Sequence, residues 1–299
     1  MKKRSRWILV AIILFVALGF AHRQWKKHEF FRPELLFSRF PAEEASALSI
    51  DVAALRKAGL LANSKEPLEP EYKAFLNGTG FDYRRDLDSL AASFSKSGNY
   101  FIAAGRFDFD KLRAYAASQG GSCFESLCRM QGSQPDRHIS FLPLRGDALA
   151  LAVAPDDLAA SRLANTGTPI SAHLPDSPVW FSVPGALLRR PGSVPPGIRL
   201  MLSALTSADR VLITVGPAGS GIEARLETNC HTPDEAKLLA SELRSTVAVL
   251  KDEMPRDQEI RDDDLAKTLA AGIFEQSGAR VTGRWPISKS LIDSLTAGI

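Results

Sequence analysis

An internal repeat constrains the fold of this chain more than any other feature of its sequence. When the sequence is shifted by 133 positions, residues 47–59 (ALSIDVAALRKAG) align with residues 180–192 (WFSVPGALLRRPG), and five of the aligned positions are identical. A second alignment places Pro155 on Pro286 at an offset of 131, each after a strand-like run and before a helical run. Two matches far apart in the sequence with nearly the same offset indicate a duplication.

Both copies predict the order strand, helix, strand, strand, helix, strand, which is that of the split βαβ or ferredoxin-like sandwich. We therefore expect an α+β protein made of two tandem split-βαβ (ferredoxin-like) units, with helices on one face of each antiparallel sheet. The first unit would span residues 40–166 and the second residues 176–299, joined by the Pro/Gly/Ser-rich stretch 164–178.

Local signals in the second unit are clear. The segment 217–221 (PAGSG) predicts a hairpin between strands 209–216 and 222–229. Thr232-Pro-Asp-Glu235 has the pattern of a capping box with proline at the first helical position, so a helix should run from there to about Lys251.

Residues 1–28 form a membrane-targeting segment. Basic residues precede an uncharged apolar run at 7–21, and further basic residues and Trp25 follow it. The run has 15 residues, about 22 Å as a helix, which is short for a span unless flanking basic side chains reach the interface. One reading is cleavage after Ala21 at a small-x-small site. The basic cluster at 23–27 favours the other reading, an uncleaved transmembrane anchor in the bacterial inner membrane that leaves the body in the periplasm.

The net charge of +3 comes from this segment. Seven of the 37 Lys and Arg residues stand in residues 1–28 without any carboxylate, which leaves 30 against 34 Asp and Glu in the body. The body therefore has a net charge of about −4. It lacks the basic stripe that nucleic-acid binding requires, and we expect no nucleic-acid partner.

Three cysteines leave at least one without an intramolecular partner. If Glu125-Ser126 is a two-residue turn, Cys123 faces Cys128 across a hairpin, where an oxidising compartment would permit a disulfide. The alternative is two small buried thiols, and the role of Cys230 stays open. The five histidines show no ligand spacing with the cysteines, which argues against a zinc site.

Several strings resemble catalytic or binding motifs but fail in context. Ser93-Phe-Ser-Lys96 abuts Ser97-Gly-Asn on a predicted strand and turn, whereas acyl-transferase serines need a helix start and a distant partner segment. The glycines of 216–221 lack the Lys-Ser/Thr of a phosphate loop and lead into a strand.

Two acidic clusters also favour structural roles. Arginines interrupt the set Asp82, Asp86 and Asp88, which would repel a calcium ion, and Asp262–Asp264 fit the start of a helix. We therefore predict no catalytic, cofactor-binding or metal-binding residues.

Two motifs give a resemblance. Residues 80–88 (GFDYRRDLD) and 105–108 (GRFD), with Ile139-Ser-Phe141 further on, resemble a group of uncharacterised bacterial membrane-anchored envelope proteins. The resemblance covers most of residues 40–155 and implies no activity. Its acidic residues fit turns and caps, and Phe81 and Phe107 fit the core.

We expect a membrane-tethered, non-enzymatic binding or accessory protein of the bacterial envelope, attached through residues 7–21 and working with an envelope protein partner. The first alternative is a periplasmic carrier of a small apolar ligand or lipid, with a cleft between the two repeats near 164–178. The second is a hydrolase, which would need a serine or aspartate beside His138, His173 or His231.

Overall fold

A computed structural model describes residues 32–61, 70–165, 167, 174–189, 205–219, 221–253, 264–288, 290 and 291. The expected transmembrane segment at 7–21 lies outside these ranges. Within them, no helix is both long and apolar enough to cross a membrane.

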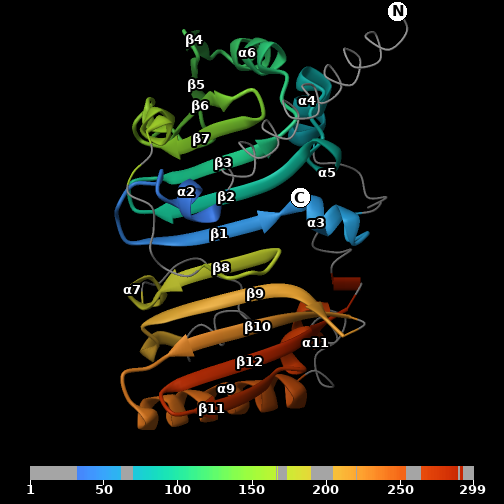
Figure 1. Ribbon diagram of the computed structural model, residues 1–299, viewed down its shortest axis with the longest axis vertical. Helices are drawn as coiled ribbons and strands as arrows, with labels where there is room; N and C mark the ends of the chain where they lie inside the picture. The colour runs from blue at the N-terminus through green and yellow to red at the C-terminus, as the bar shows by residue number, and fades with distance from the viewer. Residues whose placement is uncertain are drawn as a thin grey trace, which may run out of the picture.

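The described strands form one sheet of twelve, in the order β11-β12-β10-β9-β8-β1-β2-β3-β7-β6-β5-β4 (Figure 1). Every pairing between them is antiparallel. The mixed α+β class with antiparallel strands is therefore confirmed. The strands are β1 (Ala45–Asp51), β2 (Leu87–Ser95), β3 (Asn99–Gly105), β4 (Ser122–Phe124), β5 (Leu127–Gln131), β6 (His138–Arg145), β7 (Ala148–Ala154), β8 (Val179–Pro184), β9 (Arg210–Ala218), β10 (Gly221–Asn229), β11 (Ile273–Ser277) and β12 (Arg280–Ile287).

Several helices begin at a residue whose side chain caps them. The side chain of Asp51 accepts a hydrogen bond at the start of α3, Asp108 does so for α6, and Thr232 accepts from the amide of Glu235 in α9. The helices are α2 (Pro33–Phe37), α3 (Val52–Lys57), α4 (Pro70–Thr79), α5 (Tyr83–Asp86), α6 (Phe109–Ser118), α7 (Gly185–Leu188), α9 (Pro233–Glu253) and α11 (Asp264–Ala270), with 3-10 turns η1 (Ala159–Ala164) and η2 (Leu205–Ser207).

The expectation of two split-βαβ units is wrong. A split βαβ unit needs a crossover that returns the chain parallel to its first strand. Here Asp51 at the end of β1 lies opposite Ser89 near the start of β2, so the chain re-enters the sheet at the end where it left. In the second half, β8 pairs directly and antiparallel with β9. The second half also has the strand β11 at Ile273–Ser277, which forms the edge of the sheet beside β12.

The two halves of the sheet nevertheless repeat one order of elements. In each, three consecutive strands pair side by side, a helix follows, and the last strand of the half returns beside the third: β7 beside β3, and β12 beside β10. The first strands of the halves, β1 and β8, pair with each other, with Ala47 opposite Ser182 and Ile50 opposite Val179. The repeats are thus parts of one sheet and share its centre.

Packing divides the sheet into two faces. On the first, called the α2 face, α2 and η1 cover residues of β2, β3, β6, β7 and β8; this core includes Phe37, Tyr100, Ile102, Leu163 and Trp180. On the other, called the α9 face, α9 covers the second half and α6 covers the outer strands of the first. Figure 1 shows α2 over β1 and β2, α6 at the β4 end and α9 at the β11 end.

A single row of facing residues on the α9 face crosses all twelve strands, because residues directly opposite in antiparallel strands share a face. From edge to edge the row is Cys123, Cys128, Phe141, Leu151, Phe101, Ala92, Leu48, Phe181, Ile213, Leu226, Gly283 and Phe274. The register is therefore continuous through the junction of the halves.

Candidate functional site

A large cleft lies where the two halves of the sheet meet. Its volume is about 820 Å³. Helix α3 and the residues after it form one wall, and the β9–β10 hairpin with the end of β12 forms the other. The apolar side chains of the lining are Ala54, Leu55, Ala58, Leu60, Pro178, Val215, Pro217, Ile222 and Ile287.

Local sequence sets the position of each wall. Asp51 ends β1 and its Oδ1 accepts the amide of Ala54 at 2.8 Å, so α3 starts at once and its apolar residues turn towards the cleft. On the opposite wall the β9–β10 hairpin turns at Gly219, whose φ of 58° suits glycine. Val179 of β8 lies opposite Val215 of β9, which fixes the hairpin against the centre of the sheet.

The segment Pro175–Pro178, which leads into β8, is surrounded by hollows. Residues of this segment line three separate cavities. The first is the cleft, the second is a cavity of about 550 Å³ on the α2 face that Leu36 and Trp180 also line, and the third is a more polar cavity of about 490 Å³ beside β9 and β10. Ser177 Oγ donates to the carbonyl of Val215 at 3.0 Å and anchors the segment to β9. Three cavities thus adjoin one another at the junction of the halves.

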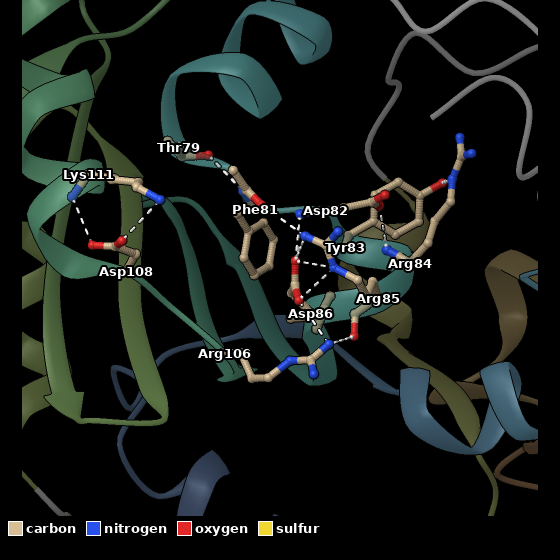
Figure 2. A network of polar contacts seen from close by, with 12 residues as sticks. Thr79, Phe81, Asp82, Tyr83, Arg84, Arg85, Asp86, Arg106, Asp108 and Lys111 are labelled. Carbon is tan, nitrogen blue, oxygen red and sulfur yellow. Dashed lines mark hydrogen bonds and ion pairs between the residues drawn. The ribbon is translucent and has the colours of Figure 1, made fainter.

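The two motifs that carry the resemblance meet in space and form a structural joint (Figure 2). The rings of Phe81 and Phe107 stack with centroids 5.1 Å apart. Arg106 Nη2 lies 2.9 Å from Asp86 Oδ1 and donates to the carbonyl of Arg85 at 2.6 Å. This joint locks α5 and the start of β2 to the end of β3.

Asp86 is the centre of that joint. Its side chain is 10% exposed, accepts the amide of Asp82 at 3.0 Å and pairs with Arg85 Nη2 at 2.7 Å. The hydrogen bond from Arg85, aided by the charge of Arg106, lowers the pKa of Asp86 to about 2, against the opposing effect of burial. An acid held ionised by two cations and a backbone amide cannot serve as a proton donor or base near neutral pH. A structural role follows.

The other motif-like strings lie in strands, turns, ion pairs and helix starts, where they have structural roles. Ser93 is buried in β2, and Lys96 lies in the turn between β2 and β3. In that turn the hydroxyls of Ser95 and Ser97 donate to Glu43, and these bonds lower the pKa of the Glu43 carboxyl. The glycines of 216–221 belong to the β9–β10 hairpin. Asp88 pairs with Arg56, and Asp264 begins α11, while Asp262 and Asp263 lie outside the described residues.

Among the residues that the structure describes, no histidine or cysteine lines the cleft. His231 Nδ1 lies 2.9 Å from Asp209 Oδ2 on the surface, and His173 lies outside the described residues. Cys230 is free and buried, and burial raises the pKa of its thiol, which disfavours a reactive thiolate. In the part of the chain that the structure describes, no group of three or more His, Cys, Asp or Glu residues could hold a metal ion.

A disulfide joins Cys123 and Cys128 across the β4–β5 hairpin. The two cysteines lie directly opposite, Phe124 lies opposite Leu127, and Glu125 at the turn has a φ of 51°. This is the geometry that the spacing predicts. The lining of the cleft was only partly foreseen, because the sequence indicates Pro178 and its neighbours but gives no sign that α3 faces the β9–β10 hairpin.

Comparison with known proteins gives a likeness of fold alone. No family model and no curated protein matches the chain. The structure of crystal form III of TP0453 is similar over 89% of this chain and 98% of that chain, with 11% sequence identity and a TM-score of 0.53. Crystal form I of TP0453 gives a TM-score of 0.47 over 89% of this chain and 99% of that chain, again with 11% identity.

Proposed function

We propose that the chain is a membrane-tethered, extracytoplasmic protein of the bacterial envelope that works by binding and not by catalysis, and that its ligand is a small apolar molecule or lipid. The observation that carries the proposal is the apolar cleft of about 820 Å³ at the junction of the halves. Its volume lies within the range of small-molecule sites, which are concave and mostly apolar.

The charges around the cleft narrow the class of ligand. Asp51 and Asp176 are the only charged residues among its lining residues. Two carboxylates in a partly apolar cleft repel an anionic head group and favour an uncharged or cationic one. A neutral lipid or a cationic amphiphile therefore suits the cleft better than a fatty acid, whose carboxylate would meet like charge.

Two features support the extracytoplasmic location. The Cys123–Cys128 disulfide suits an oxidising compartment. The basic residues before the apolar run at 7–21 favour a cytoplasmic N-terminus, which would leave the body outside the cytoplasm. Under this proposal residues 7–21 anchor the chain in the inner membrane, and an envelope protein partner receives or supplies the ligand.

Native mass spectrometry of the full-length chain, isolated from cells in detergent, tests the ligand. We expect a non-covalent adduct of a few hundred daltons on the wild-type protein. Ala58→Trp should abolish it, because Ala58 is exposed at the wall of the cleft and an indole there fills the space. Leu158→Trp is the matched control, since Leu158 is 46% exposed and does not line the cleft.

Two results would contradict the proposal: Ala58→Trp keeps the same adduct, or the wild-type protein carries no adduct. An anionic lipid as the bound species would contradict the argument from Asp51 and Asp176 while leaving the cleft as the site. The accessory role has its own test, which is cross-linking in cells: recovery of the chain alone with several cross-linkers would argue against an envelope protein partner.

A further inference from the structure

Three unusual features coincide at the tip of the β4–β5 hairpin. Phe124 is 80% exposed, the most of any large apolar side chain that the structure describes. Glu125 beside it is the one non-glycine residue with positive φ in the described ranges. The Cys123–Cys128 disulfide closes the hairpin directly below them. Burial of Phe124 would be favourable, so an exposed aromatic ring held on a cross-linked turn is typical of a preorganised anchor.

A groove with complementary properties lies at the opposite edge of the sheet. It has a volume of about 310 Å³ between α9 and the start of β11, and its lining consists of Arg244, Val247, Ala248, Lys251, Gly272, Ile273 and Phe274. The two charged residues in this lining are basic. Ile273 at its rim is 56% exposed, although it belongs to a strand. The groove thus offers apolar contacts beside two positive charges.

The basic side chains of the groove can respond to an acidic group. Arg244 is exposed and donates from Nε and Nη2 to the carbonyl of Phe274 at 3.3 and 3.2 Å, the long end of the hydrogen-bond range. A carboxylate would accept from this guanidinium in a shorter, charge-assisted pair. Glu125 is such a group, and it stands next to an aromatic ring that the apolar lining could cover.

We propose that two copies of this chain associate head to tail, with Phe124 of one copy in the α9–β11 groove of the next and Glu125 paired with Arg244 or Lys251. β4 and β11 are the two ends of the twelve-stranded sheet (Figure 1), so tip and groove of one copy cannot meet each other. The contact is therefore heterologous and leaves a free tip and a free groove at the ends of the assembly. This inference is independent of the ligand proposed for the cleft.

The contact is small, with one aromatic anchor and one ion pair, so association should be weak in solution and stronger where a membrane holds copies together. Sedimentation equilibrium of the full-length chain in density-matched detergent should show a mass that rises with concentration. Phe124→Ser should lower the association constant about tenfold or more. Leu158→Ser is the control, because Leu158 is exposed but lies away from the hairpin tip and the groove, and it should leave the association constant unchanged.

Charge reversal identifies the pair. Glu125→Arg and Arg244→Glu should each weaken association, and the variant with both changes should recover most of it, which a loss of folding could not produce. p-Benzoyl-phenylalanine at position 124 should cross-link to peptides that contain residues 244–251 or 272–274 of another copy. A chain that stays monomeric at the highest concentration reached, a double variant without recovery, or cross-links only to detergent, lipid or other surfaces would overturn the proposal.

Discussion

Replacement of Asp86 by asparagine tests the joint between the two sequence motifs. Holding the pKa of Asp86 at about 2 instead of 3.8 corresponds to about 2 kcal/mol of stability in the ionised state. Asp86→Asn removes this contribution and leaves Arg85 and Arg106 without their carboxylate. We therefore expect the free energy of unfolding at pH 7 to fall by about 2 kcal/mol. Urea unfolding of the full-length chain, followed by the fluorescence of buried Trp180 and Trp285, measures it.

The pH dependence gives the sharper test. Because folding lowers the pKa of Asp86, its contribution is fully present above about pH 4 and disappears as the pH falls through about 2. The difference between wild type and Asp86→Asn should therefore stay constant from pH 7 to about 4 and close below it. Asp110→Asn is the control, since Asp110 is 94% exposed and its pair with Arg113 at 3.6 Å should contribute little. A gap that keeps its full size at pH 2, or an equal effect of Asp110→Asn, would refute the reasoning.

Three further changes test the fold. Gly105→Ala should lower the melting temperature sharply, because a Cβ there would lie 2.3 Å from the carbonyl oxygen of Asp86; an unchanged melting curve would contradict this contact. Thr232→Ala should cost about 1 kcal/mol in urea unfolding through loss of the α9 cap, and Thr232→Ser should retain most of the stability. Reduction of Cys123–Cys128 should cost no more than about 2 kcal/mol, because the closed loop is short, and a complete loss of structure by circular dichroism would show a larger role.

Short-range features of this fold were predictable from the sequence. The β4–β5 hairpin, the Asp108 cap of α6 and the capping box at Thr232 each depend on residues within five positions of one another. The spacing alone therefore specifies them. Helix α9, expected from Thr232 to about Lys251, begins at Pro233 and ends at Glu253 for the same reason.

The topology was not predictable in the same way. The pairing of β1 with β8 joins residues about 130 positions apart, and no local pattern encodes which apolar strands become neighbours. The repeat at Ser49 and Ser182 indicates that two strands are equivalent, yet equivalence does not say that they pair with each other. The cleft depends on that pairing, because its walls come from α3 in one half and the β9–β10 hairpin in the other.

The pairing of β1 with β8, called the seam, also determines how the chain can misfold. Its four facing pairs run from Ala47–Ser182 to Ile50–Val179, and the amide of Asp51 extends it by donating to the carbonyl of Pro178 at 2.6 Å. Separation of the halves would turn both central strands into bare edges with unpaired backbone groups. Because the two edges are products of one repeat, each could pair with its counterpart from another molecule as well as with its own. Exchange of halves between molecules is therefore the misfolded state that this architecture most readily permits during synthesis.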